Sequence, residues 1–440
     1  MRESSFGGAA NRPTSAYRWV VCGLLFAATL INYSDRQILS LLAPTLQRKI
    51  GWSEREYGHI VTAFQAAYAI GYMGFGKLID VYGTKFGYSL AGVIWSMAAS
   101  AHALARSVLG FGFARFAMGL GEGCTFPASI KAIAEWFPKE ERAFATGLFN
   151  SGCNAGGILA PLIVPWLAIR YGWQSCFLAL GASGFIWLLF WQMLYRKSNP
   201  GRTTAAGGPE GHAGKPTPKD VTIKWTGILG YRQSWVCIVG WALSAPIFWF
   251  YLYWTPKFLD YRFGVRLSEV GRPMVTIYAL AAVGSIGGGW VASLLMRKGL
   301  SLNVARKLTL ALCACCTVPV FYVPFVRNAD SAVWLIGLAA AGHMGWAANL
   351  FTIVSDLFPM SAVASVVGVG GTASAVTAMA FAEYAGSVLE RSGSYLQLFE
   401  IAAVSYVAAL VVMHLLSPRY TPLARDCDRT DRREPRAAIS

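Results

Sequence analysis

Residues 18–43 read RWVVCGLLFAATLINYSDRQILSLLA, a run in which apolar side chains predominate from end to end. A helix needs about 20 apolar residues to cross a hydrocarbon core of about 30 Å, and this run has that length. Asp35 and Arg36 stand near its centre, although an arginine or aspartate at mid-membrane costs about 2.5–3.5 kcal/mol on insertion scales. The stretch therefore predicts a transmembrane helix whose charged residues serve a function.

Further apolar runs of similar length follow this one, separated by short polar breaks. They lie at 55–76, 87–105, 108–131, 142–169, 173–195, 231–256, 269–296, 304–326, 331–357, 361–389 and 395–416. Charged residues make up only 14% of the chain, whereas soluble domains carry about 25%. We therefore expect an all-α membrane protein with 12 transmembrane helices in the lipid bilayer, rather than a string of soluble domains.

The net charge of +16 would suit a nucleic-acid binder if Lys and Arg gathered in one patch, but they are spread over the breaks. Of the 38 Lys and Arg residues, 25 fall in the tails and the even-numbered breaks, and 11 in the odd-numbered breaks. Cytoplasmic loops are the basic ones, so this bias predicts a multi-pass inner-membrane protein with both termini in the cytoplasm. The polar N-terminus has no signal-peptide pattern, and we expect no nucleic-acid partner.

Two halves are indicated by a linker and by an internal echo. The Gly/Pro/Lys-rich stretch GRTTAAGGPEGHAGKPTPKD begins at residue 201 and is typical of a flexible linker. Trp-Phe-Pro at 136–138 recurs as Leu-Phe-Pro at 357–359, and Gly147 recurs as Gly368 at the same offset. Duplicated halves are typical of transporters with a substrate site at the bilayer midplane. We expect these parts: a six-helix bundle at 1–195, a cytoplasmic linker at 196–230, a second bundle at 231–416 and a cytoplasmic tail at 417–440.

The break after the second run reads GKLIDVYGTK from Gly76 to Lys85 and resembles the G-x-x-x-D-x-x-G-x-K/R loop of the major facilitator superfamily. Gly76 and Gly83 would permit a tight turn, and Asp80 with Lys85 could form an ion-pair latch that holds one transport state. The alternative is that these are solvated turn residues. The resemblance implies the major facilitator fold, two pseudo-symmetric six-helix bundles.

Within that superfamily, Asn-Tyr-Ser-Asp-Arg at 32–36 and the pair Arg115 and Glu122 resemble the anion:cation symporter family. The runs IDVYGTKFGY, EWFPKEER and GHMGWAANLFTIVSDLFP are most similar to its hexuronate transporter branch. The resemblance implies an organic anion coupled to protons or sodium, and His343 matches the hexuronate pattern. Cys153 and Gly371 stand where some sugar-acid carriers have Gln and Asn, so a ring-form hexuronate fits better than an open-chain acid.

Helical rise places the intramembrane charges. Asp35 lies 17 residues and Arg115 16 residues from the cytoplasmic ends of their spans, about 25 and 24 Å, so the two are level. Glu122 lies two turns nearer the cytoplasm, about 10 Å below Arg115. We therefore expect Arg115 to hold Asp35, both acids to carry protons, and Arg36 to bind the substrate carboxylate in bidentate fashion. The alternative is a buried ion network for packing.

Further candidates for contact with the substrate are polar side chains in the spans. Tyr68 and Tyr72 lie at i and i+4 on one helix face. Aromatic residues 248–254 could stack on a sugar or form an interfacial belt, and Asn349 could bind substrate or join helices. The candidate set outside the charges is Tyr33, Gln65, Tyr68, Tyr72, His343 and Asn349.

The sequence thus predicts a secondary active transporter that imports a hexuronate or related sugar acid by proton symport and alternating access, acting as a monomer. The residues leave the coupling ion open between proton and sodium, and the titratable side chains of Asp35 and Glu122 favour the proton. An exporter or drug/proton antiporter of the same fold is the first alternative. A membrane enzyme or receptor is the second alternative, and it is disfavoured because the short loops hold no catalytic set of residues. No metal or cofactor is expected.

Overall fold

The computed structural model describes residues 17–137, 139–196, 228–358 and 360–420, and these are helical with no strand. Most of the expected linker and the expected tail beyond Tyr420 lie outside the described residues. Before residue 196 the helices are α1 (Tyr17–Ile50), α2 (Glu54–Tyr82), α3 (Thr84–Ala101), the 3-10 turn η1 (His102–Leu104), α4 (Val108–Glu122), α5 (Thr125–Trp136), α6 (Lys139–Tyr171) and α7 (Trp173–Leu194).

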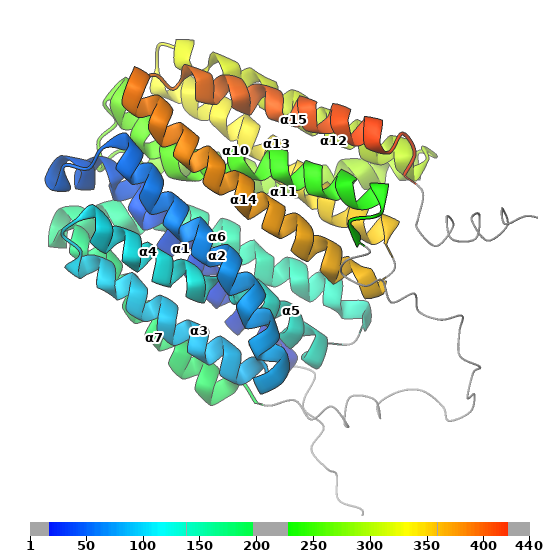
Figure 1. The fold of residues 1–440 in the computed structure, drawn as a ribbon, viewed down its shortest axis with the longest axis horizontal. Coiled ribbons are helices and arrows are strands. Elements are labelled where there is room, and N and C mark those ends of the chain that lie inside the picture. The colour runs from blue at the N-terminus through cyan, green and yellow to red at the C-terminus, as the bar shows by residue number, and fades with distance from the viewer. Residues whose placement is uncertain (1–16, 138, 197–227, 359, 421–440) are drawn as a thin grey trace, which may run out of the picture.

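After residue 228 the helices are α10 (Arg232–Phe263), α11 (Gly271–Arg297), α12 (Leu302–Thr317), the 3-10 helix η2 (Val318–Phe325), α13 (Ala329–Leu357), α14 (Met360–Ser392) and α15 (Leu396–Leu416). We call the helices up to α7 the first half and those from α10 the second half. Figure 1 shows the first half, blue to green, below the second half, green to red. Each of the twelve expected spans corresponds to one helix or one pair of consecutive helices.

Packing within the halves follows a repeated scheme. In the first half α1 packs on α6, α2 on α4, and α3 on α7. In the second half the helices at the same places in the order pack alike, α10 on α14, α11 on α13, and α12 on α15. Between the halves, α1 meets α10, α2 meets α14, and α6 meets α11. These pairings are those expected for two bundles related by a pseudo-two-fold axis.

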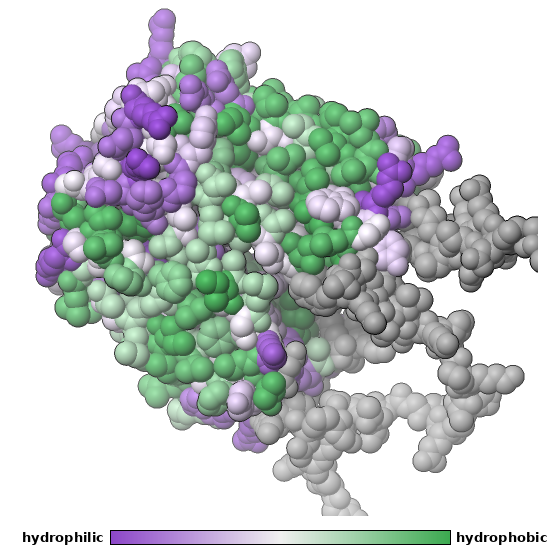
Figure 2. Space-filling view, in the orientation of Figure 1, coloured by the Kyte–Doolittle hydropathy of each residue, from purple (hydrophilic) through white to green (hydrophobic). Residues whose placement is uncertain are grey.

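Eight of the described helices are long and apolar enough to cross a membrane, and all of them begin at or after α6. Of the earlier helices, α1 and α4 carry the buried charges Asp35, Arg36, Arg115 and Glu122, and α4 and α5 have only 15 and 12 residues. Large apolar side chains such as Phe113, Met193 and Ile286 are exposed on the outside of the bundle. Figure 2 shows hydrophobic residues over the middle of one face and hydrophilic residues gathered towards one end. This is the surface that a lipid environment requires.

The fourth expected span, 108–131, is not one helix. It consists of α4 and α5, which are separated at Gly123 and Cys124. A Cβ atom at Gly123 would lie 2.7 Å from the backbone oxygen of Tyr68 and the backbone nitrogen of Tyr72. Glycine therefore allows α2 to pass close to the break, where Glu122 ends α4.

The loop motif is partly as expected. Gly83 forms a one-residue corner between α2 and α3, and its φ of 88° is a value that favours glycine. Gly76 lies inside α2 rather than in the turn, so the expectation for it was wrong. Lys85 donates to the backbone oxygen of Gln192 at the end of α7, at 2.8 Å. The side chain of Asp80 lies outside the described residues, so the latch stays a prediction.

Candidate functional site

A buried ion pair joins α1 to α4. The Nε atom of Arg36 lies 2.6 Å from Oε2 of Glu122, and the two side chains are 2% and 0% exposed. Glu122 uses only the Nε edge of the guanidinium, which leaves the edge with the two terminal nitrogens to other acceptors. This pair is the centre of what we call the charge cluster, made of Asp35, Arg36, Arg115 and Glu122.

Four aromatic rings surround the Arg36 guanidinium. Its Cζ lies 4.7 Å from the ring centroid of Tyr33, 4.8 Å from Tyr68, 5.4 Å from Phe64 and 5.5 Å from Trp249. Such cation–π contacts stabilise a desolvated cation by about 2 kcal/mol or more. Tyr33 and Tyr68, which the sequence analysis named as candidates for contact with the substrate, therefore lie at the arginine. Phe64 was missed because nothing distinguishes it from other apolar residues of the span.

Asp35 and Arg115 are buried but do not form the expected ion pair. Both carboxylate oxygens of Asp35, and the Nε and one terminal nitrogen of Arg115, find no hydrogen-bond partner among the described residues. The other terminal nitrogen of Arg115 donates to the backbone oxygen of Arg36 at 3.4 Å. Buried polar atoms without partners are rare in native structures and call for a ligand, water or a second conformation.

Two further candidates of α2, Gln65 and Tyr72, lie on either side of Tyr68 along the helix. Gln65 is buried, and its amide nitrogen has no partner among the described residues. Tyr72 reaches the cluster through Tyr68, with ring centroids 6.4 Å apart. Gln37, next to Arg36 in sequence, is also buried with both amide atoms unpartnered, and it was not a candidate from the sequence. Its place one residue after the charged pair was the signal that could have found it.

The aromatic stretch of α10 does not form an interfacial belt. Phe250, Tyr251, Tyr253 and Trp254 are all buried in the core, so that alternative is wrong for them. Trp249 contributes a contact of the second half with Arg36.

His343 of α13 lies in the second half behind this contact. Its Nδ1 is 2.6 Å from the hydroxyl of Tyr406, and its ring stacks on Phe248 with centroids 4.6 Å apart. The neighbouring Trp249 then lies over Arg36. His343 is thus linked to the charge cluster by two aromatic rings.

Asn349 lies in a different network. Its Oδ1 accepts from Arg306 at 3.1 Å, and its Nδ2 donates to the backbone oxygens of Gly288 and Gly345. Arg306 also pairs with Asp356 at 3.0 Å. These contacts join α11, α12 and α13, so the structure favours the packing alternative over substrate contact for this residue.

The two halves meet at one end of the bundle, which we call the closed end. It is the end where α1, α10 and α14 finish, at Ile50, Phe263 and Ser392. Six hydrogen bonds and ion pairs join described residues of the two halves, and all lie between the charge cluster and this end. They are Ser40–Leu252, Arg48–Asp260, Glu54–Lys257, Arg55–Glu390, Tyr57–Tyr253 and His59–Glu383.

Comparison with solved structures shows what fold this arrangement is. A D-xylose-proton symporter superposes with a TM-score of 0.72 at 15% identity, covering 92% of this chain and all of that one. A bacterial homologue of the human lysosomal transporter Spinster, in an inward-facing and occupied conformation, superposes with a TM-score of 0.70 at 18% identity, covering 92% and 97%.

Comparison with known sequences shows the family. Residues 25–382 match the family described as Major Facilitator Superfamily. The chain is 30% identical to a hexuronate transporter of Escherichia coli K12, over 92% of this chain and 95% of that protein. It is 33% identical to a galacturonate transporter of Dickeya chrysanthemi, over 72% and 94%. The chain therefore belongs to the major facilitator superfamily and, within it, to the hexuronate branch of the organic-anion transporters, which are not enzymes.

Proposed function

We propose that this protein imports a hexuronate or a related sugar acid together with protons, by alternating access. The observation that carries the proposal is the buried pair of Arg36 with Glu122. An arginine that is held by an acid in the absence of substrate can be released by protonation of that acid, which links proton binding to anion binding. The relatives that transport hexuronate and galacturonate support the choice of anion.

The planar guanidinium of Arg36 suits a carboxylate. A carboxylate can take the edge with the two terminal nitrogens in bidentate fashion, which Glu122 leaves open. The rings of Tyr33 and Tyr68 exclude water around it and strengthen the electrostatic attraction. Neutralising Glu122 then removes the competing negative charge.

Charge balance favours one proton for each anion as the minimum. The charge cluster carries two arginines and two acids, so its net charge is zero when both acids are ionised. Binding a monovalent anion alone would leave a buried net charge of −1, which is costly to desolvate. A proton taken by Asp35 or Glu122 restores neutrality.

The bias of Lys and Arg assigns the sides of the membrane. This bias puts both termini of the inner-membrane protein in the cytoplasm. The closed end is the opposite end of the bundle, so it faces outward. The six contacts there block access to Arg36 from outside, and a rocking motion that breaks them would admit substrate. Each monomer holds one complete charge cluster and can carry out this cycle alone.

Uptake by purified protein in liposomes tests the function. Radiolabelled galacturonate and glucuronate are added outside liposomes whose outer solution is more acidic than the lumen. A parallel experiment uses a higher sodium concentration outside, at equal pH on both sides. We expect accumulation driven by the pH gradient and abolished by a protonophore. Accumulation only with sodium would contradict proton coupling, and no accumulation under either gradient would contradict symport of a hexuronate.

A further inference from the structure

One face of α10 is fixed against the first half at a point where its own helical bonding is interrupted. Pro256 has no N–H, so it cannot bond to the backbone oxygen of Leu252 four residues earlier. Ser40 of α1 donates to that oxygen at 2.6 Å, and Tyr57 of α2 donates to the backbone oxygen of Tyr253 at 2.8 Å. The side chains that α10 presents here therefore have a defined position relative to the first half.

Trp249 and Tyr253 are the aromatic pair on this face. They lie one turn apart with their rings stacked, centroids 5.8 Å apart and planes at 13°. Trp249 covers Arg36. Arg36 lies 14 positions before the end of α1 and Trp249 lies 14 positions before the end of α10, so the two residues are level in the bundle. Tyr253 is one turn, about 5.4 Å, nearer the closed end.

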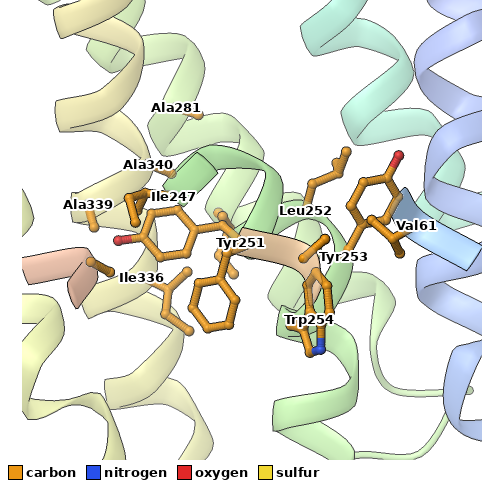
Figure 3. Close-up of a cluster of buried hydrophobic side chains, with 14 of the residues drawn as sticks. Val61, Ile247, Tyr251, Leu252, Tyr253, Trp254, Ala281, Ile336, Ala339 and Ala340 are labelled. Atoms are coloured by element: carbon orange, nitrogen blue, oxygen red, sulfur yellow. The ribbon is translucent and has the colours of Figure 1, made fainter. Parts of the chain in front are cut away.

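The hydroxyl of Tyr253 is buried and has no hydrogen-bond partner among the described residues. It lies within electrostatic range of Arg115 and Arg36, and Arg115 itself has unpartnered nitrogens. The hydroxyl of Tyr251 is also unpartnered, so burial alone does not single out Tyr253. Figure 3 shows the difference: Tyr251 lies towards Ile336 and Ala340 of the second half, whereas Tyr253 lies on the side of Val61 of α2.

We propose that the hydroxyl of Tyr253 is a substrate-binding group of the second half, which donates a hydrogen bond to an oxygen of the sugar whose carboxylate is on Arg36. The step of one turn between Trp249 and Tyr253 is a separation that a six-carbon sugar acid can bridge, with its ring against the indole. One molecule would then contact both halves when the closed end is shut. This inference rests on the proposed function and adds a residue that sets affinity and specificity.

Replacing Tyr253 by Phe removes the hydroxyl and keeps the stacked ring. We expect KM for galacturonate uptake in liposomes to rise about tenfold, the size of one lost hydrogen bond in a buried site, with an unchanged thermal unfolding midpoint. Tyr251→Phe is the matched control, because it removes a buried and unpartnered hydroxyl from the same helix; its KM should equal that of the wild type. Equal KM values for Y253F and the wild type, or the same rise in Y251F, would overturn the inference.

Galacturonates that each lack one hydroxyl identify the bonded oxygen. One of the 2-, 3- and 4-deoxy compounds should bind the wild type about tenfold more weakly than galacturonate does. Y253F should bind that compound and galacturonate equally well, because the substitution and the missing hydroxyl remove the same hydrogen bond. Losses that simply add in Y253F for every analogue would overturn the inference while leaving the proposed function standing. A wild-type protein that takes up no hexuronate would overturn the proposed function itself, and the inference with it.

Discussion

Arg36 and Glu122 come from helices that are adjacent only in the folded bundle, and their charged atoms lie 2.6 Å apart with almost no exposure. Removing one member of a buried ion pair leaves an uncompensated charge, which typically costs 3–5 kcal/mol. The pair is therefore stable while Glu122 is ionised. It separates when Glu122 takes up a proton or when another anion replaces Glu122 on Arg36. Changes at either residue should separate binding from coupling.

Glu122→Gln should abolish uphill uptake of galacturonate while preserving counterflow exchange. The amide keeps the shape of the side chain but cannot exchange a proton, so substrate can still move in both directions without energy from the gradient. Uptake driven by a pH gradient and exchange at equal pH are measured in the same liposomes. Glu400→Gln, at an exposed residue of α15, serves as the control and should retain both activities. Concentrative uptake by E122Q would exclude Glu122 as the coupling acid.

Arg36→Lys should reduce affinity for the hexuronate by at least tenfold, although the positive charge is kept. Lysine presents a compact ammonium without the planar fork, so it cannot bind Glu122 and a carboxylate on separate edges. Affinity is measured by the rise in thermal unfolding temperature on adding galacturonate. Arg48→Lys, at the exposed Arg48–Asp260 pair, should behave as the wild type. An unchanged affinity in R36K would refute the assignment of Arg36 to the carboxylate.

The sequence predicted the spans, because long apolar runs are read directly, but it did not predict the partners. Helical rise placed Asp35 level with Arg115 and Glu122 about 10 Å below, on the assumption of a straight fourth span. The fourth span is broken at Gly123, and in the structure Glu122 pairs with Arg36, while Asp35 and Arg115 form no ion pair with each other. Which side chains meet depends on helix rotation and approach, which a single sequence does not specify.

The case of Asn349 shows the same limit. The sequence left open whether it binds substrate or joins helices, because both roles use the same amide. Its partner Arg306 comes from α12, 43 residues earlier, and its two backbone acceptors belong to α11 and α13. Only the packing of three helices decides between the alternatives.

Asn349→Ala should lower stability and leave substrate affinity unchanged. Interhelical hydrogen bonds in membranes contribute about 0.6 kcal/mol on average, and two are lost here, to Arg306 and Gly288, so we expect a loss of about 1 kcal/mol. Thermal unfolding in detergent and KM for uptake are measured on the same preparation. A rise in KM without loss of stability would instead place Asn349 at the substrate.

Glu54→Gln should shift the protein towards a conformation open at the closed end. Lys257 is 5% exposed and lies 2.6 Å from Glu54, and its one further partner among the described residues is the ring of Tyr57, whose centroid is 4.4 Å away. Without the Glu54 carboxylate, the Lys257 ammonium is buried in the closed state with no counter-charge. Opening hydrates the ammonium, so the open state is favoured. Because Glu54 is itself partly exposed, we expect a shift of about 1.4 kcal/mol, or tenfold in the ratio of open to closed.

Thiol labelling measures that shift. Leu389 is buried at a cavity of about 360 Å³ between the halves, so Leu389→Cys in a background without reactive native cysteines reports on opening. An impermeant reagent should modify this cysteine about tenfold faster in E54Q. Asp260→Asn, which removes the partner of the largely exposed Arg48, should change the rate less than twofold. Adding Lys257→Met to E54Q should restore slow labelling, because no buried charge remains, and equally fast labelling of all the variants would show that the pair does not hold the closed end.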